Sequence, residues 1–163
     1  MRGTALLPVL LVLLTIGLGA AGCARPPRPG APEEVAPGPP TGREIAARAL
    51  AYLGAPYRRG GTSADGFDCS GLVQRIFLDH GVALPRTADE QAAAGAAVDR
   101  EELAPGDLVF FRFAKPKPTH VGIYVGHGRF VHAPGRSSPV RLDEMSSEYF
   151  RRRFAGARRV IPG

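Results

Sequence analysis

Cys69 is the strongest nucleophile in the body of the chain, and its surroundings in the sequence favour a reactive thiol. A polar, glycine-rich stretch, 55–66, precedes it, and an apolar pattern of helical period follows it. Cys69 is therefore predicted to lie at a helix N-terminus, where free backbone N–H groups and the helix dipole favour a thiolate. A small buried cysteine is the alternative interpretation, and the position after a flexible loop favours the nucleophile.

A thiol nucleophile needs a base, and the chain contains four histidines. Two are interpreted as surface residues, because His80 stands beside a predicted helix end and His127 at the tip of a predicted turn. His120 and His132 instead belong to two apolar segments that alternate as strands do. These two are the candidates for the base and for the residue that orients it.

The expected strand pairing brings these two histidines together. If the apolar side chains of segment 121–125 face the core, His120 and His132 share the opposite face of the sheet. A three-residue loop at 126–128 then pairs Gly122 with His132 and makes His120 a diagonal neighbour of His132. Gly122 has no side chain to obstruct a contact between the two rings. The pairing alone leaves open which histidine is the base.

Helices are predicted to dominate the first half of the chain. The segment 41–44 has the spacing of a capping box and opens a helix over 42–53, which Gly54 ends in a left-handed conformation. A second helix is predicted over 68–80, and a second capping box, 87–90, opens a third that runs into an alanine-rich stretch. The apolar stripe of the first helix is predicted to contain Ile45, Leu50 and Leu53.

The second half changes from a helical to an alternating period, which predicts antiparallel strands. Helices followed by strands indicate an α+β fold, and a body of this length needs neither a disulfide nor a metal to fold. The strands are predicted at 108–113, 121–125, 130–133, 140–142 and 155–161.

Five blocks of this sequence, in order, resemble the successive motifs of the NlpC-type, papain-like cell-wall cysteine peptidases. The resemblance covers about 57–133 and implies a papain-like core, with N-terminal helices packed on an antiparallel sheet of about five or six strands. The blocks are Gly66-Phe-Asp-Cys-Ser-Gly-Leu-Val73, Leu84-Pro-Arg86, Pro105-Gly-Asp-Leu-Val-Phe-Phe111, His120-Val-Gly-Ile-Tyr-Val125 and Phe130-Val-His-Ala133.

The resemblance also implies roles for individual residues and a reaction. Cys69 is expected to be the nucleophile, His120 the general base and His132 the orienting residue. The reaction is expected to be hydrolysis of amide bonds in the stem peptides or cross-links of peptidoglycan, without a metal or other cofactor. It further implies roles for three residues near the nucleophile: Tyr57 close to the developing oxyanion, and Asp68 and Ser70 at a substrate amine. Asp68 is equally suited to be the N-cap of the second helix.

Three other functions remain open at this stage. Cys69 with two histidines has ligand types that bind zinc, although the sequence contains no Cys-x-x-Cys or His-Glu-x-x-His spacing. A non-catalytic peptidoglycan-binding lipoprotein on the same fold is a second alternative, and the intact Cys69, His120 and His132 argue against it. Transfer of the acyl group to an amine in place of water is the third.

The first 40 residues are predicted to direct and tether the protein. Residues 1–22 have the short basic start, the apolar run and the small residues of a signal peptide. Cys23 follows at the position of a lipidated cysteine, although Ala20 stands where a lipobox usually has Leu, and 24–40 contain seven prolines typical of an extended linker. We expect a peptidase domain over 41–163, anchored by acyl chains on Cys23 to a membrane of the cell envelope, facing the periplasm or the exterior.

The chain is basic, with a formal net charge of +6 over 163 residues. Charge of this sign suits anionic partners in general, but no nucleic-acid-binding motif accompanies it. The arginines of 151–159 alternate with apolar residues and are interpreted as a solvated face over a core edge. We expect peptidoglycan as the partner, no nucleic acid, and a monomer.

Overall fold

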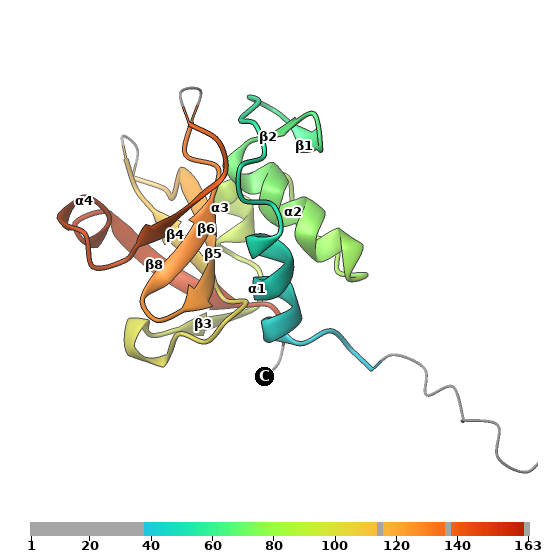
Figure 1. Cartoon of the computed structure of the whole chain (residues 1–163). Helices are drawn as coiled ribbons and strands as arrows, with labels where there is room; N and C mark the ends of the chain where they lie inside the picture. The colour runs from blue at the N-terminus through green and yellow to red at the C-terminus, as the bar shows by residue number, and fades with distance from the viewer. Residues whose placement is uncertain (1–37, 114–115, 136–137, 162–163) are drawn as a thin grey trace, which may run out of the picture. The chain divides into compact units, whose positions relative to one another are not determined.

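A computed structural model describes residues 38–113, 116–135 and 138–161 (Figure 1). The predictions on the signal peptide, on Cys23 and on most of the linker lie outside these residues. None of the helices in the described part of the chain is long and apolar enough to cross a bilayer.

The first helix, α1 (Gly42–Leu50), begins at the predicted capping box. The backbone N–H of Glu44 donates to Oγ1 of Thr41 at 3.3 Å, and the N–H of Thr41 donates to the Glu44 carboxylate at 2.7 Å. Gly54 is left-handed as predicted, with φ +85°, but the helix ends at Leu50 and the chain reaches Gly54 through turns.

The predicted apolar stripe of α1 is wrong for Leu50 and Leu53, which are 41 % and 44 % exposed. At about 100° per residue, Leu50 stands roughly 140° around the helix from Ile45, so the two cannot share one face. Leu53 lies beyond the helix end. The buried face consists of Ile45, Ala46 and Ala49.

The second helix, α2 (Cys69–Asp79), follows the prediction closely. Asp68 is its N-cap, and Gly81, with φ +78°, follows the C-cap His80. A small hairpin of β1 (Thr62–Ser63) and β2 (Gly66–Phe67) interrupts the segment that the sequence predicts to be a loop. The expected apolar stripe of α2 is buried and contains Leu72, Val73, Ile76 and Phe77.

The six-stranded antiparallel sheet agrees with the predicted α+β class and strand number. Its strand order is β3-β8-β4-β5-β6-β7. The strands are β3 (Ala96–Val98), β4 (Leu108–Phe111), β5 (His120–Gly126), β6 (Arg129–His132), β7 (Arg141–Glu144) and β8 (Phe154–Arg159).

The sequence missed three short elements around this sheet. Strand β3 lies in the alanine-rich stretch that was expected to follow a helix, because alanine carries no strand signal and only the pairing with β8 orders it. The third predicted helix is only the short α3 (Ala88–Gln91), and two further turns of helix are η1 (Arg100–Glu102) and α4 (Glu148–Arg151).

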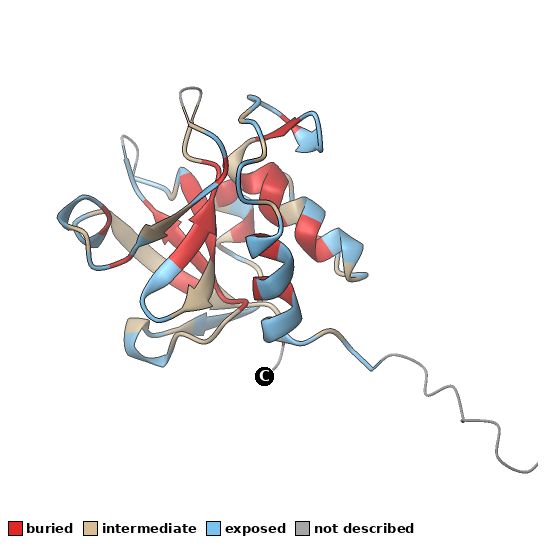
Figure 2. Ribbon diagram, viewed as in Figure 1, coloured by how far each residue is buried: buried red, intermediate tan, exposed pale blue. Residues whose placement is uncertain are grey.

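Side chains cover both faces of the central strands, which Figure 2 shows as buried. Helices α1 and α2 lie side by side against β5 on one face (Figure 1). The other face carries a second cluster in which Phe111, Phe130 and Phe150 contact one another. Phe150, from the unpredicted α4, thereby joins residues of β4 and β6 in a core on this second face.

The hairpin between β5 and β6 differs from the predicted three-residue loop. Gly126 pairs with Arg129, so only His127 and Gly128 form the turn, and both have positive φ, 54° and 70°. Two positive φ values are typical of a type I′ turn, whose twist suits a tight hairpin. A bulge between Tyr124 and Gly126 absorbs the difference, so the expected register of the remaining pairs is kept.

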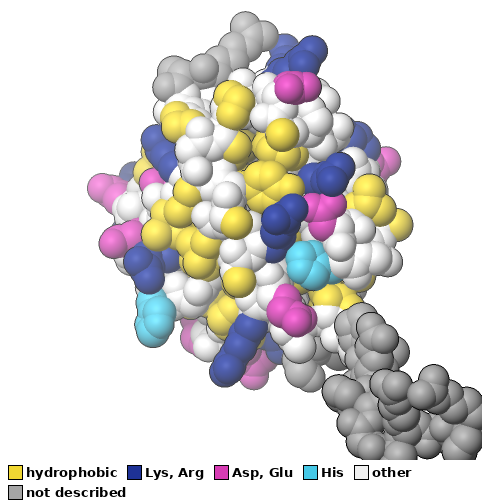
Figure 3. Space-filling model, turned by 45° about the vertical axis from the view of Figure 1, so that its right-hand side comes forward, with side chains coloured by type: hydrophobic (Ala, Val, Ile, Leu, Met, Phe, Trp, Pro, Cys, Tyr) yellow, Lys and Arg dark blue, Asp and Glu magenta, His cyan; other side chains and the backbone are white. Residues whose placement is uncertain are grey.

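The arginines near the C-terminus are only partly the solvated face that the sequence predicts. Arg159 donates through Nε and Nη2 to the buried carboxylate of Asp107, at 2.8 and 2.7 Å. This ion pair fixes β8 to the turn that enters β4. Figure 3 shows one face of the molecule, on which basic and acidic side chains are interspersed with apolar ones.

Candidate active site

The glycine-rich loop before α2 and the N-cap Asp68 hold Cys69 at the first position of the helix. Both oxygens of the Asp68 carboxylate accept backbone hydrogen bonds: Oδ1 from Gly71 N at 2.7 Å and Oδ2 from Gly60 N at 3.0 Å. Gly71 lies against the carbonyl of Gly61, since a Cβ on Gly71 would stand 2.0 Å from that oxygen. A glycine is therefore required in the first turn of the helix, directly below the half-buried thiol.

The environment of Cys69 favours the thiol over the thiolate. Burial raises the pKa of Cys69, backbone N–H groups led by that of Val121 lower it, the negative charge of Asp68 raises it, and the net change is upward. From its place at the helix N-terminus, the sequence predicted that the pKa of Cys69 would be lowered. The prediction is wrong because desolvation outweighs the backbone contribution.

His120 and His132 form the contact that the sequence predicts. Nε2 of His120 lies 2.7 Å from Nδ1 of His132, and the rings stand at 86° to each other. The strand position of Gly122 allows this, because a Cβ there would lie 3.2 Å from Cβ of His132. Phe150 packs edge-to-face on His132 with centroids 5.4 Å apart, which limits rotation of the ring.

Asp143 on β7 is a member of this cluster that the sequence did not reveal. Its Oδ2 lies 2.9 Å from Nε2 of His132, and Nε and Nη2 of Arg141 donate to the same oxygen at 3.0 and 2.8 Å. The predicted strand stopped at Leu142, one residue short. The available signal in the sequence was that an acidic residue, Asp143, directly follows the predicted strand 140–142.

Burial keeps both imidazoles neutral. Desolvation, followed by the charge of His132, lowers the pKa of His120 from 6.5 to about 3. Desolvation also lowers the pKa of His132 to about 4, even though the hydrogen bond and the charge of Asp143 raise it. With the thiol of Cys69 protonated as well, the resting site consists of a neutral thiol and a neutral imidazole.

Cys69 lies where two cavities meet. The larger, about 740 Å³, is lined by polar side chains that include Ser70, Arg59 and Lys117. The smaller, about 290 Å³, is lined by His120 together with the aromatic rings of Phe113 and Tyr149. Tyr57 and Thr119 line both cavities, as Cys69 does.

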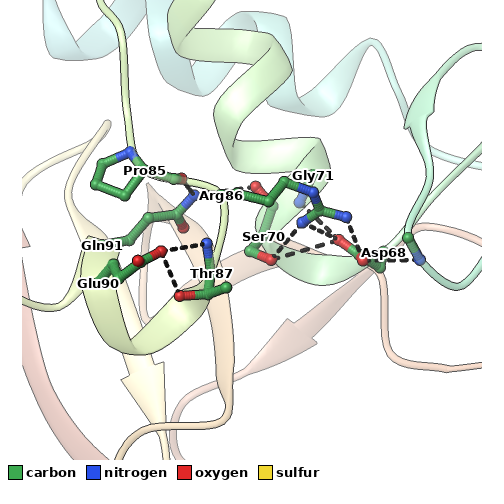
Figure 4. Close-up of polar contacts among 9 residues, drawn as sticks. Asp68, Ser70, Gly71, Pro85, Arg86, Thr87, Glu90 and Gln91 are labelled. Carbon is green, nitrogen blue, oxygen red and sulfur yellow. Dashed lines mark hydrogen bonds and ion pairs between the residues drawn. The ribbon is translucent and has the colours of Figure 1, made fainter.

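Arg86 is the second site residue that the sequence left without a role. Its guanidinium donates to both oxygens of Asp68, at 3.0 and 2.6 Å, and to Oγ of Ser70 at 2.9 Å (Figure 4). Burial raises the pKa of Asp68, but the hydrogen bonds from Arg86 and Gly71 lower it by more, so the net shift of the pKa is downward. Nε2 of Gln91 ties this segment to α2 by donating to the carbonyls of Ser70 and Pro85.

Each predicted site residue in the described part of the chain lies in or beside this cleft. Cys69, His120 and Tyr57 line the cavities, and His132 stands behind His120. Asp68 is both the N-cap of α2 and part of the wall of the larger cavity, where Ser70 also lies. Within residues 38–113, 116–135 and 138–161, no group of three or more His, Cys, Asp or Glu side chains is arranged to hold a metal ion.

Comparison with known proteins agrees with this geometry. A family model described as the NlpC/P60 family matches residues 54–159. A crystal structure of an NlpC/P60 family protein from Bacillus cereus ATCC 10987 superposes with a TM-score of 0.73 at 36 % identity, over 77 % of this chain and 42 % of that one.

Two similar proteins have names that state different bonds. The chain is 47 % identical over 111 residues to the murein DD-endopeptidase MepS/murein LD-carboxypeptidase of Escherichia coli K12, which covers 68 % of this chain and 58 % of the relative. It is 40 % identical over 113 residues to a gamma-D-glutamyl-L-lysine dipeptidyl-peptidase of Bacillus cereus, covering 68 % of this chain and 34 % of the relative. The chain thus spans less than two thirds of the length of either relative.

Proposed function

Because the chain belongs to the NlpC/P60 family, we propose that it hydrolyses amide bonds in the peptide part of peptidoglycan, with Cys69 as nucleophile and His120 as general base. The observation that carries this proposal is that Cys69 and His120 line one cavity, while His132 occupies the Nε2 side of the His120 ring. Nδ1 of His120 is then the nitrogen available to the thiol.

The charge states of the site define the first chemical step. A neutral imidazole takes the proton of the thiol as sulfur attacks the carbonyl carbon, so the ion pair forms only during the reaction. The oxyanion that develops needs hydrogen-bond donors, and the backbone N–H of Cys69 at the start of α2 and the hydroxyl of Tyr57 are our candidates. His120 then gives its proton to the leaving amine, and water releases the acyl group from Cys69.

The two cavities divide the substrate between them. The leaving amine must lie beside the group that protonates it, and His120 lines only the smaller, aromatic cavity. We assign the amine side of the cut bond to that cavity and the acyl side to the larger, polar one. The resemblance implies that Asp68 and Ser70 contact an amine of the substrate, and this role stays a prediction. In the structure, Asp68 accepts hydrogen bonds from Arg86, Gly71 and Gly60.

The test is digestion of purified muropeptides by the purified full chain, followed by mass spectrometry. Uncross-linked and cross-linked muropeptides are compared, because the names of the two relatives point to a bond within the stem and to a bond between stems. We expect fragments from one of these pools, and none from a Cys69→Ala variant. Unchanged substrate, or the same products from Cys69→Ala as from the wild type, would refute the proposal.

Two added reagents address the remaining alternatives. Iodoacetamide is expected to abolish cleavage and a chelator to leave it unchanged; the reverse result would favour a zinc enzyme. An added amine that appears in the product in place of water would favour transfer over hydrolysis. Binding of intact peptidoglycan without any cleavage would favour a non-catalytic lipoprotein.

We also propose that Cys23 is acylated and holds the domain at a membrane of the cell envelope. The support is the sequence pattern of 1–22 and the proline-rich spacing that follows. More than one acyl chain on a residue gives stable anchoring. A Cys23→Ala protein should leave the membrane fraction, and its retention there would count against the anchor.

A further inference from the structure

Asp143 lies at the end of a row of three buried or half-buried polar groups. Nε2 of His120 meets Nδ1 of His132 at 2.7 Å, and Nε2 of His132 meets Oδ2 of Asp143 at 2.9 Å. Three adjacent strands supply one member each: β5, β6 and β7. The row points away from Cys69, so Asp143 contacts neither the thiol nor the cavity that contains it.

Asp143, at the end of the row, determines which atom donates and which accepts in each of its hydrogen bonds. Oδ2 of Asp143 accepts two N–H groups of Arg141, and a carboxylate oxygen in this role is an acceptor. His132 must then carry its proton on Nε2 and donate it to Asp143, because an unprotonated nitrogen 2.9 Å from that oxygen would bring two lone pairs together. Nδ1 of His132 is left as an acceptor.

The tautomer of His132 determines in the same way which nitrogen of His120 carries the proton. Nδ1 of His132 can accept only if His120 carries its proton on Nε2 and donates it. A neutral imidazole carries one N–H, so Nδ1 of His120 is left with a free lone pair. The nitrogen that can face the thiol is therefore the one able to take a proton from it.

We propose that Asp143 is a positioning residue, which sets the tautomer of His132 and through it the tautomer of His120. The inference rests on the proposed function only in naming His120 as the base. When the thiol gives its proton to Nδ1, the other hydrogen bonds in the row keep their direction. His120 becomes an imidazolium and holds that proton on Nδ1 until the leaving amine takes it. No further reactant is needed.

The other charged groups around Asp143 do not replace it. Arg141 is on the same strand and donates to it. Asp143 also borders a separate cavity of about 490 Å³, where the remaining titratable side chains are Glu144 and Tyr149. Neither of them has a hydrogen bond to His132 among the described residues. His132 therefore depends on Asp143 for a partner at Nε2.

The first test compares Asp143→Asn with the matched control Glu144→Gln. Both changes remove one negative charge from β7, and only the first touches His132. The amide of Asn can turn its NH₂ toward Nε2 and favour the wrong tautomer. We expect kcat to fall on the order of 10- to 100-fold in Asp143→Asn, less than the loss when a triad aspartate bonded directly to the base is replaced. KM should hold steady, and Glu144→Gln should match the wild type.

The second test reads the tautomers directly and does not depend on turnover. In ¹⁵N spectra of the histidine rings of the wild-type chain at neutral pH, His120 and His132 should both carry the proton on Nε2. In Asp143→Asn the two rings should shift toward the Nδ1 form. A wild-type spectrum with His132 protonated on Nδ1 would overturn the proposal even if the variant failed to fold. So would a folded Asp143→Asn protein with unchanged tautomers or unchanged kcat. An inactive wild type with the expected tautomers would instead count against the proposed function alone.

Discussion

His120 and His132 lie on neighbouring strands with ring nitrogens 2.7 Å apart, and the residue across from His132 is a glycine. Both residues are almost fully buried, at 7 % and 1 % exposed. The burial of this pair sets its protonation state, and the missing side chain at Gly122 sets its geometry.

Cys69 is expected to react as a thiol with a high pKa. Burial raises its pKa, so alkylation by iodoacetamide should be slow at pH 7 and accelerate above the usual thiol value of about 8.5. The rate is measured against pH in a Cys23→Ala background, with the urea-unfolded protein as the control for an ordinary thiol. A rate that already reaches its plateau near pH 6 would show a resting thiolate.

Stability is expected to fall as the pH is lowered through the histidine range. The folded pKa values of His120 and His132 lie near 3 and 4, below the unfolded value of 6.5. Below pH 6.5 the unfolded chain therefore binds protons that the folded chain does not. The free energy of unfolding should decrease by up to about 1.4 kcal/mol per pH unit for each histidine, and this contribution is fully present above pH 6.5.

Urea unfolding at pH 7.5, 6.5 and 5.5 measures this slope. The lowered pKa of Asp68 acts only around and below its ordinary value of 3.8, so it does not overlap this window. A His132→Gln variant should show about half the slope, since one of the two buried histidines is gone. Equal stability at all three pH values would mean that the histidines are not held neutral.

Gly122→Ala is expected to disrupt the histidine pair. The new Cβ would lie 2.6 Å from Cδ2 of Phe130 and 2.8 Å from the carbonyl oxygen of Val131, closer than such contacts allow. Overpacking of this kind costs about 1–3 kcal/mol and should also displace His132 and lower kcat. Gly38→Ala is the control, because a Cβ there has no neighbour within 4 Å. Wild-type stability and activity in Gly122→Ala would contradict the strand geometry described above.

Arg86 and Asp68 are expected to act as a pair that holds the start of α2. Arg86 is 37 % exposed at its side chain and Asp68 17 %, so solvent weakens the attraction. A double-mutant cycle of Arg86→Gln and Asp68→Asn should give a coupling free energy of about 1 kcal/mol. Asp68→Asn alone should keep the N-cap, since Asn caps as well as Asp. Additive losses would mean that the two side chains do not stabilise each other.

The periodicity of the sequence alone was enough to predict the main features of this site. Cys69 at the start of α2 follows from the loop-to-helix transition, and the contact of His120 with His132 follows from strand alternation about Gly122. These are local patterns, and local backbone geometry decides them. The error in the stripe of α1 was also local, because Leu50 does not fit the helical period that Ile45 begins.

What the tertiary structure decided are the contacts between segments far apart in the chain. Asp143 meets His132 because β7 pairs with β6, and Arg86 meets Asp68 because the segment before α3 folds back on α2. The pKa of Cys69 is raised, and not lowered as the sequence predicted, for the same reason. Its helix N-terminus could be read from the sequence, but the desolvation that outweighs it comes from surfaces that only the folded chain brings together.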